Sequence, residues 1–238
     1  METLTFVCWK WKGPAGYRST FSPQTVNVLA GMLKRHYHGP HELVCVTDYA
    51  QGIDPAVRIV PLWSDHCELP SPHGRGYPSC YRRLRMFSAE AEQWFGPRFV
   101  SMDLDVVITG DITPLFDNQL DIKLYGDVAL RTPYNGSLIQ LRAGSRRQVW
   151  DTFDPVESPK RTLKMGMVGS DQAWIAAALG PGEAKWGQPD GVHSFRLHIQ
   201  RAGYQLPANS RLVIFHGNFD PWTPQANMIS WIRKWYRA

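Results

Sequence analysis

The sequence has few cysteines, and none of them are paired in a recognisable motif. Cys8, Cys45, Cys67 and Cys80 are the only cysteines in 238 residues, and no Cys-x-x-Cys occurs. The spacing of Cys67 and Cys80 does not suit a zinc site, and Cys8 and Cys45 lie in apolar segments typical of buried thiols. Neither a disulfide framework nor a zinc centre is predicted, so a reducing compartment is expected.

The sequence also lacks long apolar runs, internal repeats and low-complexity tracts. No apolar run approaches the roughly 20 residues that a membrane-spanning helix needs, and no stretch has the pattern of a signal peptide. Together with the cysteine usage, these absences predict a cytoplasmic protein. No Pro-, Gly- or Ser-rich linker divides the chain, so residues 1–238 are expected to form one domain.

Charge of either sign is moderate. Lys and Arg number 26 against 21 Asp and Glu, for a formal net charge of +5. The excess would favour an anionic ligand or surface, but its clusters are short and each is simply explained as a solvated basic face. Aromatic residues are frequent at 12% with ten Trp, and they either pack in a core or stack on sugars and bases.

Short β-branched runs alternate with helical patterns, which predicts an α/β fold that begins with a nucleotide-binding half. Ser22 and Pro23 suit the cap and first residue of a helix, and Val26, Leu29 and Leu33 follow at helical spacing. The expected strands cover 4–9, 43–47, 57–62, the segment before residue 103, 137–141 and 211–215; helices are expected from 22, 79, 170 and 227; loops are expected at 64–80, 151–169 and 181–191.

Two aspartates, Asp103 and Asp105, directly follow the apolar segment that begins at Arg98. Ligands of parallel α/β sheets bind outside the carboxyl ends of strands, and residues i and i+2 of an extended segment share a face. Two carboxylates on one face suit a hard divalent cation, which often carries a substrate diphosphate. The pair therefore predicts metal-assisted chemistry on a phosphorylated substrate, with an ordinary Asp-containing turn as the alternative.

Five motifs follow one another in a recognisable order. They are Tyr81-Arg-Arg-Leu84, Asp103-Leu-Asp105, Tyr134-Asn-Gly-Ser137, Gly169-Ser-Asp-Gln172 and Phe215-His-Gly-Asn-Phe-Asp-Pro-Trp222. With them the chain resembles the retaining glycosyltransferases of family 8, the glycogenin and galactosyltransferase-like group, over most of its length. The resemblance implies a GT-A (Rossmann-like) nucleotide-sugar-binding fold with a mixed, mostly parallel central sheet flanked by helices. It divides the domain into a nucleotide-binding half (1–108), an acceptor and sugar half (109–225) and a C-terminal helix (226–238).

The resemblance assigns a metal site to Asp103, Asp105 and His216, with Mn²⁺ (or Mg²⁺) on the donor diphosphate. Two carboxylates, an imidazole and phosphate oxygens suit an octahedral shell. The family pattern is His-x-x-Gly-x-x-Lys-Pro-Trp, but this chain has Ile214 at the His position, and His216 follows on the same face. Asp220 replaces the Lys that meets the diphosphate, so either another cation serves or donor binding differs. The candidate cations are Arg131, Arg142, Lys164 and Lys185.

The resemblance implies further site residues. Asp171 and Gln172 are the implied catalytic residues: Asp171 binds sugar hydroxyls, and Gln172 lies near the anomeric carbon opposite the leaving diphosphate. Arg83 contacts the donor, for which a guanidinium fork is well suited. Without the resemblance, Asp171 and Gln172 are simply a helix N-terminus and Arg83 a surface ion pair. The other donor-binding residues are Asp103, Tyr17, Gly217 and Trp222, and the acceptor-binding residues are Asn135, Gly136 and Ser137.

The expected activity is metal-dependent transfer of a sugar from a nucleotide-sugar donor, with UDP-sugars favoured, to an unidentified acceptor with retention. No general base is apparent, and in this group the departing phosphate can take the acceptor proton. One alternative is a haloacid-dehalogenase-like phosphatase with Asp103 as nucleophile. Another is a degenerate transferase fold that only binds an anionic partner. The terminal segment 231–237, with Trp, Ile and basic residues, also suits peripheral contact with an anionic surface.

Overall fold

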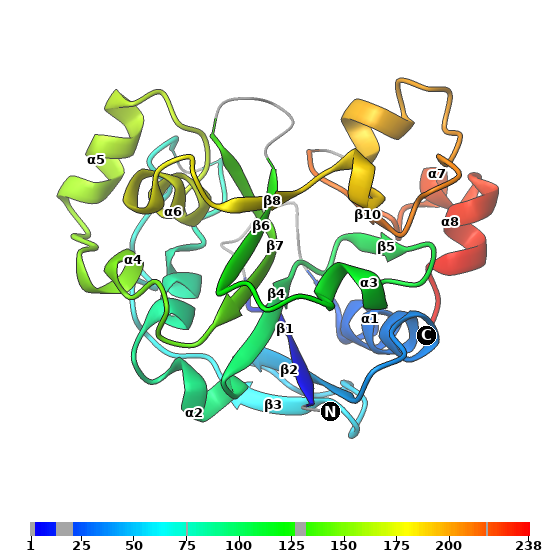
Figure 1. Ribbon diagram of the computed structural model, residues 1–238, viewed down its shortest axis with the longest axis horizontal. Coiled ribbons are helices and arrows are strands. Elements are labelled where there is room, and N and C mark those ends of the chain that lie inside the picture. The colour runs from blue at the N-terminus through cyan, green and yellow to red at the C-terminus, as the bar shows by residue number, and fades with distance from the viewer. Residues whose placement is uncertain (1–2, 13–20, 75, 127–131, 218) are drawn as a thin grey trace.

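The computed structural model describes residues 3–12, 21–74, 76–126, 132–217 and 219–238. A seven-stranded sheet runs through the centre in the order β3-β2-β1-β4-β7-β6-β8 (Figure 1). Four of its six strand pairs are parallel, and β7 runs antiparallel to β4 and β6. This confirms the predicted fold class, a mixed and mostly parallel sheet flanked by helices. The strands are β1 (Leu4–Lys10), β2 (His41–Thr47), β3 (Arg58–Pro61), β4 (Arg98–Met102), β6 (Ile122–Gly126), β7 (Tyr134–Arg142) and β8 (Ala184–Trp186).

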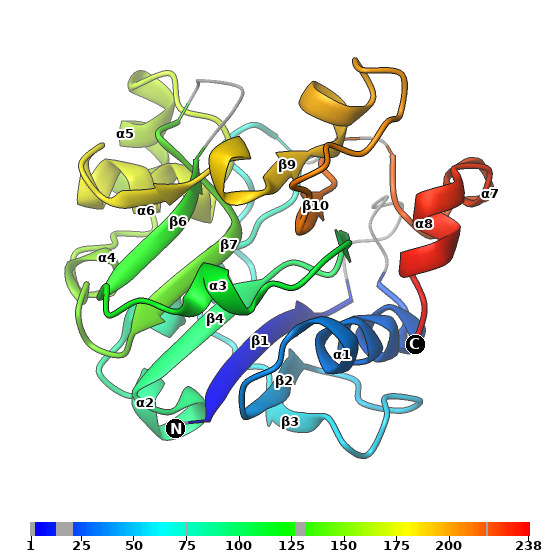
Figure 2. The same ribbon diagram turned by 45° about the vertical axis from the view of Figure 1, so that its right-hand side comes forward.

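A second, three-stranded sheet stands beside the first (Figure 2). It consists of β5 (Val106–Ile108), β10 (Leu212–Ile214) and β9 (Val192–Ser194), with β10 in the middle. β5 pairs with β10 in an antiparallel register, and Phe215 N–H donates to the Asp105 carbonyl at 2.9 Å. The segment after β10 therefore lies beside the turn that carries the aspartate pair. Strands from 1–108 and from 109–225 share both sheets, and the proposed division of the domain stays a prediction.

The helix α1 (Pro23–His36) forms where the sequence predicts it. Ser22 occupies the N-cap position in extended conformation, and proline follows at the start of the helix, where it costs no hydrogen bond. Val26, Leu29 and Leu33 are buried, which explains the apolar spacing. Lys34 and Arg35 lie in its last turn, where the helix dipole favours positive charge.

Alternate residues of β1 face two different cores. Phe6 and Cys8 pack with α1, the second sheet and the C-terminal helix, whereas Val7 and Trp9 pack on the opposite side. Figure 1 shows α4, α5 and α6 on one side of the central sheet and α1, α7 and α8 on the other. The remaining helices are the 3₁₀ helix η1 (Tyr81–Phe87), α2 (Ala91–Phe95), α3 (Thr113–Phe116), α4 (Gln148–Asp151), α5 (Glu157–Lys164), α6 (Asp171–Leu179), the 3₁₀ helix η2 (Gln188–Asp190), the π-helix η3 (Phe195–Ile199), α7 (Pro224–Asn227) and α8 (Ser230–Trp235).

Two helical segments differ from the sequence-based expectation. The helix predicted from Ser79 is the 3₁₀ helix η1, which ends because Ser88 adopts an extended ψ of 166° before α2 begins. The segment 151–169, predicted to be irregular, contains α5. Its Pro159 lies in the first turn, where proline is tolerated.

Two further segments were also predicted wrongly. The predicted loop 181–191 contains β8, whose three residues pair in parallel with β6 and bury Trp186. A strand of three residues is too short to show an alternating apolar pattern, and β8 forms because it pairs with β6. The last helix, predicted for 227–236, is α8 and begins only at Ser230, because Ile229 adopts an extended ψ of 114°; Asn227 instead ends the separate short helix α7.

Candidate active site

A buried arginine joins two of the predicted site carboxylates. Arg83 on η1 donates to Oδ2 of Asp171, the first residue of α6, from Nε at 2.7 Å and lies within 2.6 Å through Nη2. Its Nη1 donates to Oδ1 of Asp103, directly after β4, at 2.5 Å. The side chains of Arg83 and Asp171 are 8% and 4% exposed, whereas that of Asp103 is 25% exposed. The structure thus brings together three residues predicted from separate motifs, here called the Arg83 trio.

The charges of the Arg83 trio do not cancel, because one guanidinium faces two carboxylates. Burial alone would lower the pKa of Arg83, but Asp171 and Asp103 hold that pKa above its ordinary value. Burial raises the pKa of Asp171, and the charge of Arg83 opposes the increase. Desolvation offsets most of the attraction in such a pair, so its main consequence is a fixed geometry rather than added stability.

The strand β7 approaches the trio closely because it has glycine at position 136. A Cβ atom on Gly136 would lie 2.7 Å from Nη2 of Arg83, so a larger residue would displace a buried guanidinium. The carbonyl of Ser137 accepts a hydrogen bond from Asp103 N–H at 2.9 Å, and Oδ1 of Asn135 accepts one from Ser137 N–H at 2.9 Å. The predicted acceptor-binding residues therefore lie directly against the trio.

Gln172 is oriented by backbone on both sides. Its Nε2 donates to the Val168 carbonyl at 2.9 Å, and its Oε1 accepts from Gly136 N–H at 3.4 Å. Gly169 has a left-handed φ of +99°, and a Cβ there would lie 2.5 Å from Cγ of Gln172. Only glycine both adopts this φ without strain and leaves room for the Gln172 side chain. Gly169 therefore allows Gln172 to lie beside the predicted acceptor-binding segment.

Ser170 links the starts of two helices. The sequence predicts it as the cap of α6, and it occupies that position, but its side chain does not cap the helix. Instead, its Oγ accepts a hydrogen bond from Cys80 N–H at 2.8 Å, just before η1. Burial raises the pKa of the Cys80 thiol to about 12, so this thiol is protonated at neutral pH and is not a nucleophile.

His216 lies beside the second sheet rather than in the Arg83 trio. Its Nε2 is 2.6 Å from Oγ of Ser194, the last residue of β9. That Oγ already accepts a hydrogen bond from Leu197 N–H at 3.1 Å, so its proton is available for His216. In the arrangement seen, one of the two ring nitrogens of His216 is therefore occupied by a hydroxyl.

The residues predicted to hold a metal have suitable donor atoms but do not form an assembled site. Asp103, Asp105 and His216 would offer carboxylate and imidazole ligands of the kind that Mn²⁺ and Mg²⁺ accept. Within the described ranges, however, no group of three or more His, Cys, Asp or Glu side chains is arranged to hold an ion. In this arrangement, Oδ1 of Asp103 contacts Arg83 and Nε2 of His216 contacts Ser194.

Asp220, which replaces the family's lysine, lies near Asp105 and the C-terminal helix. Asp220 is 6% exposed. Burial, and then the negative charges of the nearby Asp105 and Asp220, raise the pKa of Tyr236. The nearby Trp222, a predicted donor-binding residue, packs between Phe21 and Tyr236 with ring centroids at 5.7 and 6.4 Å. The end of the 215–222 motif therefore packs against the C-terminal segment through Trp222 and Tyr236.

Of the four cations suggested as substitutes, the three in the described part of the chain have contacts or positions elsewhere. Arg142 pairs with Asp121 at 2.8 Å, on the rim of the central sheet. Lys185 on β8 lies over the ring of Tyr134 at 5.9 Å, and Lys164 ends α5. Arg131 falls outside the residues that the structure describes.

The region at the end of β1 is only partly described. Tyr17, a predicted donor-binding residue, lies outside the described residues. Trp9 on β1 is buried and donates from Nε1 to Oγ of Ser101 at 2.8 Å, so it belongs to the core. Lys10 donates to the carbonyl of Tyr49 at 2.8 Å.

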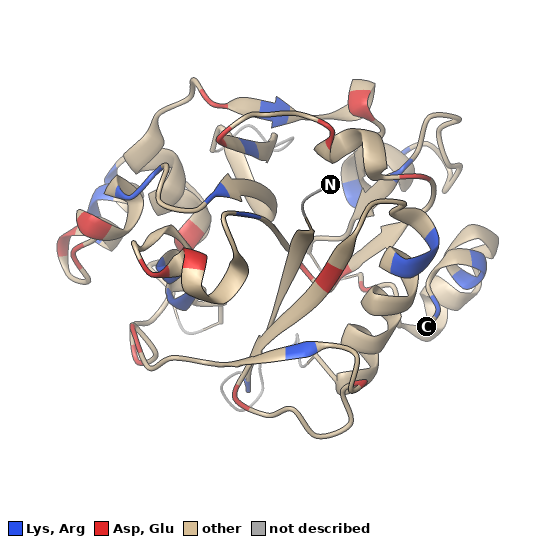
Figure 3. Cartoon of the chain, turned by 60° about the horizontal axis from the view of Figure 1, so that its bottom comes forward, with Lys and Arg blue, Asp and Glu red and all other residues tan. Residues whose placement is uncertain are grey.

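The C-terminal helix α8 uses its apolar side within the protein. Trp231 and Ile232 are buried in the core that contains α1. Basic residues remain exposed on it, and Figure 3 shows Lys and Arg interspersed with Asp and Glu elsewhere on the chain. Contact with an anionic surface stays a prediction. Because the apolar side of α8 is buried, such contact would depend on the basic residues alone. Among the described residues, no helix has both the length and the apolar character to cross a bilayer.

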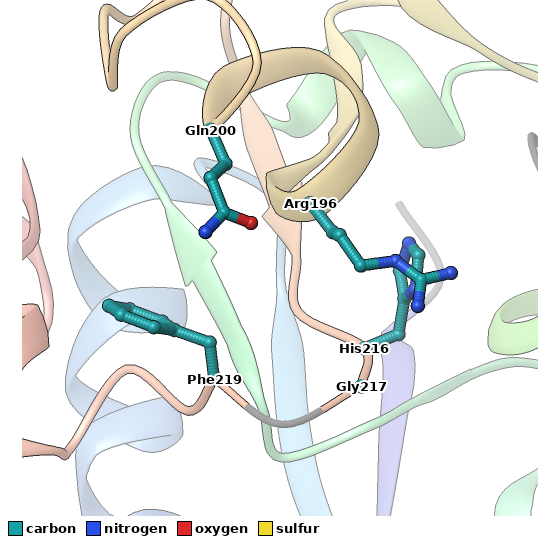
Figure 4. A pocket seen from close by; sticks show the side chains of 5 residues that line it. All are labelled: Arg196, Gln200, His216, Gly217 and Phe219. Atoms are coloured by element: carbon teal, nitrogen blue, oxygen red, sulfur yellow. The ribbon is translucent and has the colours of Figure 1, made fainter.

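One cavity brings the predicted residues His216 and Gly217 together with three residues for which no role was predicted. It has a volume of about 340 Å³ and is lined by Arg196, Gln200, His216, Gly217 and Phe219 (Figure 4). Two of these come from η3 and the turn that follows it. The sequence offered no signal for this grouping, because it depends on the pairing of β9 with β10, and β9 has only three residues.

The chain has the fold of known glycosyltransferases. The galactosyltransferase LgtC, solved with donor and acceptor sugar analogs, matches with a TM-score of 0.63 and 14% identity over 99% of this chain and 97% of LgtC. Mouse xyloside xylosyltransferase 1 matches with a TM-score of 0.54 and 15% identity over 92% of this chain and 98% of that one. The Streptococcus pneumoniae glycosyltransferase GlyE matches with a TM-score of 0.57 and 10% identity over 94% of this chain and 57% of GlyE. No family model and no curated protein matches the sequence. The likeness confirms the predicted GT-A fold.

Proposed function

We propose that this protein is a glycosyltransferase that moves a sugar from a nucleotide-sugar donor, a UDP-sugar being the first candidate, to an acceptor. The observation that carries the proposal is the Arg83 trio, which lies at the carboxyl end of β4 together with Gln172 and Gly136. Ligands of such sheets bind at this end of the strands. The fold shared with LgtC, which was crystallised with donor and acceptor sugar analogs, adds support.

In this proposal, Arg83 and Asp171 bind the hydroxyl groups of the donor sugar. They already hold each other at 2.6 to 2.7 Å before any substrate arrives. Because folding already fixes the geometry of these two side chains, they lose less conformational freedom when the sugar binds. Asp103 contacts the same guanidinium and is 25% exposed, so a sugar held there would also lie near this carboxylate.

The proposed reaction breaks the bond between the anomeric carbon and the diphosphate oxygen and forms a bond to the acceptor oxygen on the same face. Positive charge develops on the sugar ring as the first bond breaks. The Oε1 atom of Gln172 and the carboxylate of Asp171 supply fixed negative potential that stabilises this charge. The departing phosphate oxygen takes the proton of the acceptor hydroxyl, so no general base is required from the chain.

The proposed cofactor is Mn²⁺ (or Mg²⁺), held by Asp103, Asp105 and His216. When bound, it would supply positive charge for the departing diphosphate. Support comes from the donor atoms of these residues and from the hydrogen bond between Phe215 N–H and the Asp105 carbonyl, which keeps His216 next to the aspartate turn.

A thermal-shift screen of nucleotide sugars with Mn²⁺ tests the function. A donor present at about 100 times its Kd should raise the Tm of a protein of this size by about 5–10 °C. The stabilising donor is then incubated with candidate acceptors, and with water alone, and the released nucleoside diphosphate is measured. Absence of stabilisation and of nucleotide release across the panel would overturn the proposal.

Metal binding is expected to depend on the donor. Because Arg83 holds Asp103 and Ser194 holds His216, Mn²⁺ alone should bind weakly, whereas a diphosphate adds oxygen ligands and should raise the affinity at least about tenfold. Calorimetry of Mn²⁺ with and without UDP, corrected for the Mn²⁺–UDP complex in buffer, measures this. The enhancement should vanish in Asp105→Ala and persist in Asp121→Ala, which removes an exposed carboxylate paired with Arg142. Equal affinities with and without UDP would contradict the prediction.

Two results would favour the alternatives. A protein that binds a nucleotide sugar but never releases the nucleotide is the degenerate transferase fold. Hydrolysis of p-nitrophenyl phosphate that is lost in Asp103→Asn would indicate the phosphatase, with Asp103 as nucleophile.

A further inference from the structure

The cavity beside His216 is formed by the register of two short strands. β9 and β10 are parallel, with Ser194 opposite Ile214. Two residues beyond each of them come Arg196 and His216, so the register brings the start of η3 alongside the end of β10. The Ser194–His216 hydrogen bond of 2.6 Å fixes this arrangement.

Arg196 is exposed and reaches the backbone after β10. Its Nη1 lies 3.6 Å from the position that a Cβ on Gly217 would occupy, and Gly217 has a left-handed φ of +99°. Figure 4 shows the guanidinium extending from η3 towards His216 and Gly217, with Gln200 and Phe219 across the cavity. Arg196 makes no ion pair with any carboxylate in the described ranges, so its charge is not neutralised by them.

The charges around this segment make that guanidinium significant. Asp103 and Asp105 lie on the turn beside β10, and Asp220 lies three residues beyond Gly217. Arg83 is already shared by two carboxylates. Arg196 is the only Lys or Arg among the residues that line the described cavity.

We propose that Arg196 binds the diphosphate of the donor and provides the positive charge that position 220 lacks. The inference rests on the proposed function, because it assumes a nucleoside-diphosphate donor. A guanidinium is always charged and offers paired N–H donors that match phosphate oxygens. Gly217 has no side chain and so leaves room for this guanidinium beside the backbone that follows β10.

The test compares Arg196→Met with the wild-type protein by calorimetry. UDP, GDP, ADP and CDP are titrated first, and the nucleotide that binds most tightly is carried forward with its monophosphate and its nucleoside. Arg196→Met should weaken diphosphate binding about 10- to 100-fold, with a smaller loss for the monophosphate and none for the nucleoside. The loss should shrink as salt is raised, because the cavity is open to solvent. Arg201→Met, an exposed arginine five residues later, is the matched control and should bind like the wild-type protein.

The outcomes separate the two proposals. If the wild-type protein binds no nucleoside diphosphate, with or without Mn²⁺, the proposed function fails and this inference fails with it. If the wild-type protein and Arg196→Met bind the diphosphate equally, or if Arg201→Met loses as much affinity, only the role of Arg196 is overturned. Unchanged Tm values in both variants establish that the comparison concerns folded proteins.

Discussion

Replacing Arg83 by methionine is expected to lower the free energy of unfolding by about 3–5 kcal/mol and to abolish sugar transfer. Methionine fills much of the same volume, but it leaves Asp171, which is 4% exposed, as a buried carboxylate without its cation. The sugar-binding geometry would be lost at the same time, because Arg83 orients both Asp171 and Asp103. Urea denaturation measures the stability, and nucleotide release from the donor measures the activity.

Two variants control this experiment. Arg85→Met, two residues further along η1, breaks an ion pair with Asp65 whose side chains are 28% and 30% exposed, and it should cost no more than about 1 kcal/mol and leave activity intact. The double variant Arg83→Met/Asp171→Asn removes the uncompensated charge, so it should regain much of the stability but none of the activity. Equal losses in Arg83→Met and Arg85→Met would contradict the special role of the trio.

Gly169→Ala is expected to destabilise the protein by about 2–4 kcal/mol and to reduce turnover about a hundredfold. The residue has a φ of +99°, which alanine adopts only with strain, and the new Cβ would lie 2.5 Å from Cγ of Gln172. Gln172 would have to move, and with it the carboxamide oxygen that we propose stabilises the reacting sugar. Denaturation curves and initial rates at saturating donor measure the two effects.

Gly166→Ala separates backbone strain from displacement of Gln172. Gly166 also has a left-handed φ, of +69°, but a Cβ there meets nothing within 4 Å. It should cost about 1 kcal/mol of stability and leave turnover unchanged. If Gly169→Ala retained full turnover, or if Gly166→Ala lost as much of it, the position of Gln172 would not explain the result.

Local elements with a repeated burial pattern were predictable from the sequence. β1 alternates between two cores, and α1 has its cap, its proline and its apolar stripe in order, so neighbouring residues alone carry enough information. α5 and β8 were not predicted. α5 has a proline in its first turn, and β8 is too short to have a period, so only packing against the rest of the chain reveals them.

The candidate site was predictable as a set of residues but not as an arrangement. The five motifs named Arg83, Asp103, Asp171 and Gln172, yet no sequence pattern places an arginine between two carboxylates. Similarly, the acid at position 220 was evident, whereas the guanidinium proposed to replace the missing cation was not. Arg196 becomes adjacent to Gly217 only when β9 and β10 pair.

The sequence by itself determined the α/β class, most strands of the central sheet, and the aspartate pair at the end of β4. These features depend on interactions between residues that are close in the sequence, so the apolar periodicity and the turn residues of each short segment are enough to predict them. The tertiary structure alone decided which charged groups come together. Arg83 and Asp171 are 88 residues apart in the sequence. Arg196 comes near the end of β10 only because β9, the strand before it, pairs with β10. Such contacts depend on how the layers of the fold pack together. That packing results from many weak interactions spread over the whole chain, so the residues that finally touch carry no local sequence pattern.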